Sequence, residues 1–269
     1  GQVKYFYNNA IIQYNLVKKY TADVQTKEVT RTINYVDKTT EQPMPSDLIQ
    51  TITQTVTFTQ YQVKDRNGNM IGYNTSGTWN DDTYIPSTES NGQIKIDTTD
   101  IDESWINSAD IKWDTVTNPN LKRNGYSGPF ESDGSTDFTS VVGESPTALT
   151  ANNTINVYYT EDTVEVTSGE PKQSGDDIAG TDEKYPSGVA ENDLNKTVTR
   201  IIHVYNPDNQ SVNTETQDVK YTRTATINIV TKVVTYSDWV STNNKWSEYL
   251  PTLDAGESIR SITDMNDNA

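Results

Sequence analysis

The chain has 269 residues, a formal net charge of −17 at pH 7 and only 32% hydrophobic residues. This length accommodates one or two domains. The strong negative charge disfavours nucleic acid and anionic membrane surfaces as partners, because both are bound through clustered Lys and Arg. No apolar run approaches the roughly 20 residues of a transmembrane helix, so we expect no membrane insertion.

The composition also limits the chemistry that the chain can perform. It contains no Cys and one His, which excludes a thiol nucleophile and leaves little basis for a zinc site or a Ser-His-Asp triad. His203 has no partner motif, and we interpret it as a solvent-facing strand residue rather than a general base. We therefore predict that the protein is not an enzyme.

Alternation of apolar and polar side chains predicts strands at residues 27–36 and 49–63, each with one buried and one wet face. Residues 65–69 contain Asn-Gly, a strong hairpin signal, and a third strand is expected at 70–79. An acidic start and apolar spacing of four residues predict a short helix within 99–109. The expected fold class is therefore mostly β with a short helix (α+β).

The strand pattern of the first half returns in the second half, with loops of different length. Such self-similarity indicates repeated structural units. The matched segments are 29–35 with 198–204, 54–60 with 217–223, and Trp79 with Trp246.

We divide the chain into four parts on this basis. Residues 1–24 are expected to be closing strands of a preceding unit or an N-terminal ribbon. Residues 25–165 form the first repeat unit. Residues 166–195, rich in Ser, Gly, Asp and Pro, are expected to be a linker or long solvated loop. Residues 196–269 form a second, apparently shorter unit.

The motif Val-Thr-Arg-Thr-Ile-x-Tyr at 29–35, followed by Gln-Thr-Val-x-Phe-Thr at 54–59 and a downstream Trp, resembles the mucus-binding (Mub, MucBP-type) repeats of lactobacillal cell-surface adhesins. The resemblance covers residues 27–165 well and 196–250 more loosely. Gln60 departs from the Arg that is usual in this family. The resemblance implies elongated β-grasp (ubiquitin-like) units in tandem.

The same resemblance implies a function and a location. Such repeats attach bacteria to mucin glycans, and some bind immunoglobulins. It therefore implies a non-enzymatic adhesin repeat at the extracellular bacterial cell surface, anchored to the cell wall by parts outside this chain, of which we expect it to be a fragment. The alternatives are an immunoglobulin-binding module and a stalk or spacer without a ligand.

Aromatic residues are the best candidates for a glycan site, because sugar rings stack on Trp and Tyr. Trp79 and Trp246 recur in both copies, which is typical of core anchors. The predicted ligand-binding residues are instead those in or near the segment without an apparent repeat: Trp105, Trp113, Tyr84 and Tyr126.

Three further expectations concern ions and charge. Asp97, Asp100 and Asp102 supply oxygen ligands at a density that could hold calcium, although a solvated helix start explains them equally well; no other cofactor is expected. Arg31 and Arg200 lie on apolar strand faces and should have structural partners. Self-association is expected as the pH falls toward 4.3, the sequence pI, because the charge repulsion is then lost.

Overall fold

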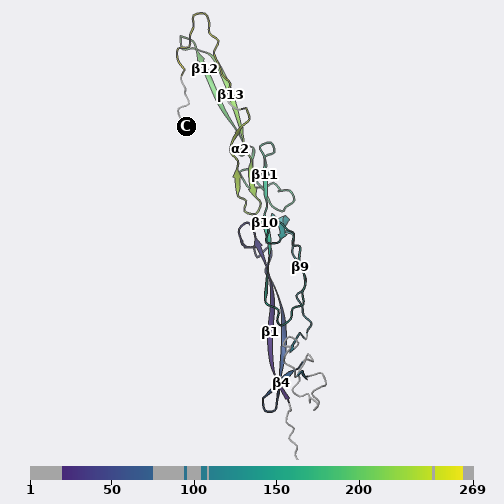
Figure 1. The fold of residues 1–269 in the computed structure, drawn as a ribbon. Coiled ribbons are helices and arrows are strands. Elements are labelled where there is room, and N and C mark those ends of the chain that lie inside the picture. Colours follow the sequence, from purple (N-terminus) through teal and green to yellow (C-terminus); the bar gives the residue numbers. More distant parts are fainter. Residues whose placement is uncertain (1–19, 75–93, 96–103, 108, 244–245, 263–269) are drawn as a thin grey trace, which may run out of the picture. The chain divides into compact units, whose positions relative to one another are not determined.

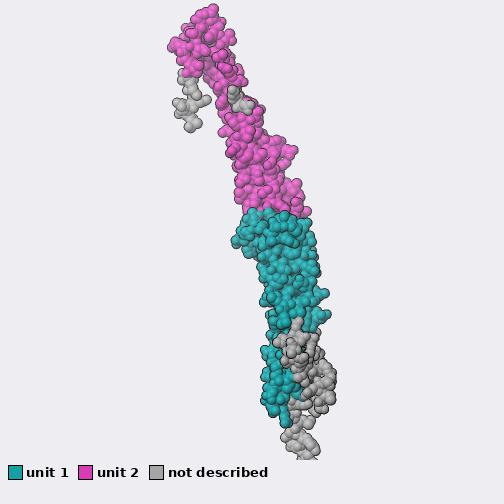
Figure 2. Space-filling model, in the orientation of Figure 1, with its two compact units in different colours: residues 1–120, 128–160 teal, residues 121–127, 161–269 magenta. Residues whose placement is uncertain are grey.

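The computed structural model of the protein describes residues 20–74, 94–95, 104–107, 109–243 and 246–262. The chain forms two compact units (Figure 2). Unit 1 contains residues 1–120 and 128–160, and unit 2 contains residues 121–127 and 161–269. Both are built mainly from strands (Figure 1), which confirms the predicted mostly-β fold class.

Unit 1 is organised around the long strand β1 (Tyr20–Asp37). Strand β3 (Ile52–Asp65) pairs with it in antiparallel fashion, and β10 (Asn153–Glu161) pairs with its other edge in parallel. The sheet order is β5-β4-β3-β1-β10-β8, with β2 on β1 and β6 on β3, while β7 and β9 form a separate pair. The remaining strands are β2 (Gln42–Pro43), β4 (Met70–Asn74), β5 (Ile94–Lys95), β6 (Trp105–Ile106), β7 (Val116–Thr117), β8 (Tyr126–Phe130) and β9 (Ser140–Val141).

The alternation in β1 has the expected packing consequence. Val29, Ile33 and Tyr35 are buried on one face, together with Val56 and Phe58 of β3. Because successive strand residues point to opposite faces, the intervening Thr residues face outward. The parallel β1–β10 pair beside an antiparallel hairpin is compatible with a β-grasp unit, and the tandem β-grasp arrangement remains a prediction.

Unit 2 contains two three-stranded sheets. One has the order β11-β14-β15 and the other β12-β13-β16. A short helix, α2 (Glu191–Leu194), leads directly into β12, and a 3₁₀ turn, η1 (Lys122–Asn124), also belongs to this unit. The strands are β11 (Thr163–Val166), β12 (Asn195–Tyr205), β13 (Ser211–Thr222), β14 (Ala225–Asn228), β15 (Val234–Tyr236) and β16 (Val240–Ser241).

The segment 166–195, expected to be a linker or solvated loop, forms part of the unit 2 core. It has little regular secondary structure, but it buries apolar side chains against β14 and the residue after it. A segment rich in polar residues can still pack when a few apolar side chains are correctly spaced. The buried cluster consists of Val166, Ile178, Tyr185, Val189 and Leu194 with Ala225, Ile227 and Ile229.

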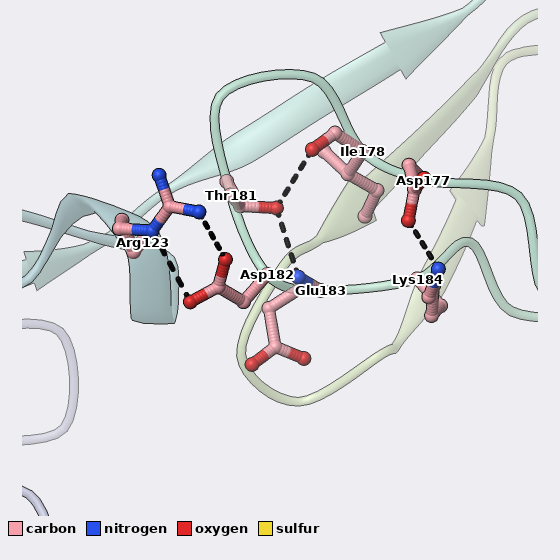
Figure 3. Close-up of polar contacts among 7 residues, drawn as sticks. All are labelled: Arg123, Asp177, Ile178, Thr181, Asp182, Glu183 and Lys184. Carbon is pink, nitrogen blue, oxygen red and sulfur yellow. Dashed lines mark hydrogen bonds and ion pairs between the residues drawn. The ribbon is translucent and has the colours of Figure 1, made fainter.

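Polar contacts fix the turn within this segment (Figure 3). The Thr181 hydroxyl donates to the Ile178 carbonyl at 2.8 Å and accepts from the Glu183 backbone N–H at 3.1 Å. Arg123 pairs with Asp182, with 2.7 Å between guanidinium nitrogen and carboxylate oxygen. These contacts hold Ile178 in place to enter the core.

One other expectation needs correction. Residues 20–24 form the beginning of β1, where Thr21 lies opposite Lys64; the two alternatives for residues 1–24, closing strands of a preceding unit or an N-terminal ribbon, remain predictions, because residues 1–19 lie outside the described residues. Trp105, placed on a helix face by its spacing, lies in strand β6 and pairs with β3; residues 96–103 of the predicted helix lie outside the described residues. The 65–69 hairpin turn is confirmed, since it connects β3 and β4. Within the described ranges, no helix has the length and apolar character needed to span a membrane.

Candidate ligand-binding surface

An arginine at the centre of unit 1 organises the surrounding side chains. Arg31 is fully buried. Its guanidinium donates to Gln54 Oε1 at 2.7 and 3.0 Å, to the Asp114 carbonyl at 2.8 Å and to the Val142 carbonyl at 2.7 Å. It also stacks on the Trp113 indole, 5.4 Å from the ring centroid. The predicted structural role of Arg31 is confirmed, and its partners are amide and backbone oxygens, so its charge is solvated by dipoles.

Unit 2 repeats this arrangement with different solvent exposure. Arg200 donates to Gln217 Oε1 at 2.5 Å and to the Ser247 carbonyl at 2.8 Å, and it lies 5.5 Å from the centroid of the Trp246 ring. Arg200 is only partly buried, unlike Arg31. The structural role predicted for Arg200 is therefore also confirmed.

The matching contacts correct the predicted pairing of tryptophans. In both units the arginine stacks on a Trp and bonds to the carbonyl of the following residue, which is Asp114 after Trp113 and Ser247 after Trp246. Trp113 is thus the counterpart of Trp246. Trp79, matched to Trp246 from sequence, lies outside the described residues.

A second tryptophan pair follows from the strand register. In unit 1, Trp105 lies opposite Gln60 on β3. In unit 2, β16 pairs with β13 so that Val240 lies opposite Thr222, which places Trp239 beside Arg223, the position equivalent to Gln60. Trp105 and Trp113, which lie in or near the segment predicted to have no repeat, therefore correspond to Trp239 and Trp246.

The predicted ligand-binding residues have mainly packing roles. Trp113 and Tyr126 are 1% and 2% exposed, so neither ring can stack on a sugar, and both predictions require correction. Trp105 is partly buried and packs on the core cluster that contains Val29, Val56 and Phe58. Tyr84 lies outside the described residues.

An exposed cluster in unit 2, here called the Arg223 surface, consists of Arg223, Tyr236 and Trp239. The Arg223 guanidinium lies 3.6 Å from the Tyr236 ring centroid and 4.5 Å from that of Trp239. Both rings remain open to solvent, at 39% and 37% exposure. Arg223 stands at the position equivalent to Gln60, where Arg is usual in the family that the sequence resembles. Its aromatic neighbours were missed because they lie on two later segments.

Hydrogen bonds hold the Arg223 surface in a fixed geometry. Arg223 Nε donates to the Asp193 carbonyl at 2.7 Å, and the Tyr236 hydroxyl donates to the Gly188 carbonyl at 2.8 Å. A Cβ at Gly188 would lie 2.5 Å from that hydroxyl, and its φ is +96°, so glycine is required here. The arrangement presents aromatic rings beside a fixed cation, which suits stacking of a sugar with hydrogen bonds to its polar groups.

Unit 1 has a polar hollow of about 480 Å³ at its surface. Its walls are two loops joined by reciprocal backbone hydrogen bonds between Trp113 and Glu144. It contains no exposed aromatic ring, so it lacks the stacking element of the Arg223 surface. The lining residues are Lys112, Asp114, Thr115, Gly143, Glu144 and Ser145.

His203 is exposed on β12, as predicted, with Nδ1 3.2 Å from the Thr214 hydroxyl. Asp97, Asp100 and Asp102 lie outside the described residues, so calcium binding there remains a prediction. In the portion of the chain that is described, no three His, Asp or Glu side chains come together as a metal site.

Comparison with known proteins bears on unit 2. Residues 189–251 match the family model of the Muc B2-like domain. This segment is similar to the Muc B2-like domain. The predicted resemblance to mucus-binding repeats is thereby confirmed for this part of the chain. The Arg223 surface lies within this matched segment.

Three solved structures are also similar to the chain. The mucin-binding domain of Spr1345 from Streptococcus pneumoniae has 20% identity and a TM-score of 0.32, and the match covers 52% of this chain and 96% of that domain. The type 2 repeat of the mucus-binding protein MUB from Lactobacillus reuteri has 14% identity and a TM-score of 0.28, covering 84% and 83%. Mub-RV has 17% identity and a TM-score of 0.29, covering 81% and 74%. Scores of this size do not establish a shared fold. No curated protein matches the chain.

Proposed function

We propose that this chain is an adhesin segment that binds mucin glycans through its Muc B2-like domain, without catalysis, at the extracellular bacterial cell surface. The observation that supports the proposal is the match of residues 189–251 to the Muc B2-like family, combined with the exposed Arg223 surface within that segment. The proposed location includes attachment of the protein to the cell wall.

The chemistry of the Arg223 surface fits a glycan. The exposed portions of Tyr236 and Trp239 can contact the apolar face of a sugar ring, and Arg223 can donate hydrogen bonds to hydroxyl or carboxylate oxygens. A contact area of this size gives weak binding for one domain. Many copies on one cell would convert weak contacts into avidity.

The test is binding of the chain to immobilised mucin before and after enzymatic removal of its glycans. Trp239→Ala should weaken binding about tenfold, as expected for the loss of roughly 1.4 kcal/mol of stacking. Tyr205→Ala is the matched control, because Tyr205 is an exposed aromatic (58%) outside the Arg223 surface. Equal loss in both variants, or binding that survives deglycosylation, would contradict the proposal.

The same plates distinguish the other functions. Immunoglobulin is tested in parallel wells, and binding to it alone would favour a protein-docking module. Binding to neither would favour a stalk or spacer. Light scattering between pH 7 and 4.5 tests the proposed acid-induced self-association, which is contradicted by an unchanged particle size.

A further inference from the structure

The two units contain the same β-hairpin in the same register. Arg31 of β1 lies opposite Gln54 of β3, and Arg200 of β12 lies opposite Gln217 of β13. In each hairpin the arginine bonds to that glutamine and stacks on a tryptophan. Strand β12 is therefore the counterpart of β1, residue for residue.

In unit 1, both edges of β1 are occupied. The edge away from β3 pairs with β10 in parallel, from Arg31 opposite Asn153 to Asp37 opposite Tyr159. This added strand supplies alternate apolar side chains, with Ile155 beside Ile33. Along residues 31–33, β1 thus has a strand on each side, β3 on one edge and β10 on the other.

In unit 2, the corresponding edge of β12 pairs with no strand that the structure describes, since the sheet order is β12-β13-β16. The side-chain exposure differs accordingly. Ile33 and Tyr35 of β1 are 0% and 4% exposed, whereas their counterparts Ile202 and Val204 are only partly buried. An edge strand with unpaired backbone groups and half-buried apolar side chains is a template for strand addition.

We propose that the outer edge of β12, from Arg200 to Val204, binds an extended polypeptide segment as an added parallel strand. The partner is defined by the chemistry that β10 shows on β1: an uncharged residue beside the arginine, then apolar side chains at alternate positions. Backbone hydrogen bonds supply the affinity, and the apolar side chains covering Ile202 and Val204 supply the selectivity.

The probe is a labelled synthetic peptide with the sequence of residues 151–161, which contains β10. We expect saturable binding to the intact chain by fluorescence polarisation. Hydrogen exchange should show at least a tenfold slowing of amide exchange in β12 on peptide addition, with no change in β1, whose edge already holds β10. The control peptide carries Ile155→Asp and Val157→Asp and should not bind.

Matched chain variants locate the site. Ile202→Lys should reduce peptide affinity at least tenfold. Ile201→Thr should leave the affinity unchanged, because Ile201 lies on the opposite face of β12 and Thr is the residue at the equivalent position of β1, Thr32. If Ile202→Lys does not fold, hydrogen exchange of β12 in the unmodified chain, measured with and without peptide, still tests the proposal. The proposal would be overturned by absence of saturable binding or by slower exchange in β1 instead of β12. It would also be overturned if sedimentation without peptide showed a dimer in which β12 is covered.

Discussion

The β1–β3 hairpin of unit 1 and the β12–β13 hairpin of unit 2 carry the same Arg–Gln pair and the same stacked Trp, yet their burial differs. In unit 1 the arginine is fully buried and has additional carbonyl partners, and β10 covers the outer edge of β1. In unit 2 the arginine and its strand are partly open. The comparison shows that a repeated motif fixes local contacts, while the contribution of these contacts to the free energy of unfolding depends on how deeply they are buried.

The indole nitrogens show the same contrast in detail. Trp246 Nε1 donates to the Gln217 carbonyl at 3.1 Å. Trp113 Nε1 is buried with no partner among the described residues. Burial in unit 1 therefore costs one indole hydrogen bond, which the apolar contacts of the ring with its core cluster offset.

The largest expected effect is the loss of Arg31. Arg31→Ala removes the donor to Gln54, Asp114 and Val142, whose oxygens would lie unpaired in the interior, so unit 1 should lose about 3–5 kcal/mol of stability. Arg200→Ala should cost about 1 kcal/mol, because water can replace its contacts. Urea titration with hydrogen exchange measures each unit separately. Equal losses of stability in Arg31→Ala and Arg200→Ala would refute the role of burial. Arg66→Ala is the control, because Arg66 lies in an exposed turn.

Truncation of the paired isoleucines comes next. Ile33→Ala should destabilise unit 1 by about 2–4 kcal/mol, and Ile202→Ala should destabilise unit 2 by about 1 kcal/mol, because the cavity term requires a closed core. Val56→Ala and Val219→Ala serve as the matched control. Both valines are fully buried, so the two substitutions should lower the stability of their units by similar amounts. Thermal unfolding followed by circular dichroism gives the values. An Ile202 loss as large as that of Ile33 would contradict the open edge of β12.

Alkaline pH should destabilise unit 1 before unit 2. Burial raises the pKa of Tyr35 and Tyr159, and for Tyr159 the neighbouring Tyr35 adds to the effect. Folded-state values above the ordinary value of 10 give stability that is complete below pH 10 and is lost as the pH rises beyond it. Unit 2 has Val204 in place of Tyr35. Exchange protection of β1 should therefore fall above pH 10 before that of β12.

The double variant Tyr35→Phe and Tyr159→Phe provides the check on this pH effect. It removes both ionisable hydroxyls, with the hydrogen bonds to Asn118 and to the Pro119 carbonyl, so stability at neutral pH should fall by about 1–2 kcal/mol. Its exchange protection should depend less on pH above 10. Loss of protection in β1 and β12 at the same pH in the unmodified chain would show that burial of these tyrosines is irrelevant.

The smallest expected effect concerns two similar turns. Asp65 accepts from the backbone N–H groups of Asn67 and Asn69, and hydrogen bonds from Asn69 lower its pKa. Asn206 makes the equivalent bonds to Asp208 and Gln210 without a charge. The contribution of Asp65 is present above its unfolded value near 4 and is lost as the pH falls through its lowered folded value.

Amide exchange at Asn67 and Asn69, corrected for intrinsic pH dependence, should therefore lose protection in acid, while the Asn206 turn should not. Asp65→Asn should make the first turn behave like the second. Identical acid behaviour of the two turns in the unmodified chain would contradict the assignment.

The long strands, the repeated hairpin and the structural role of Arg31 and Arg200 could be predicted from the sequence, because they depend on period-2 alternation and on the cost of burying a charge without partners. Spacing along the chain could not show that Trp113, rather than Trp79, corresponds to Trp246. That match depends on which carbonyl reaches the arginine across the fold.

Which aromatic rings are open to solvent could not be predicted from the sequence, because it depends on tertiary contacts. Trp113 and Tyr126 are of the same residue types as Trp239 and Tyr236. Trp113 and Tyr126 are nevertheless buried, whereas Tyr236 and Trp239 flank Arg223 and are exposed to solvent. Composition likewise concealed the core formed by residues 166–195, since five apolar side chains suffice to fix a polar segment when distant strands present a matching surface. Burial is a property of contacts between segments far apart in sequence, and local pattern does not encode it.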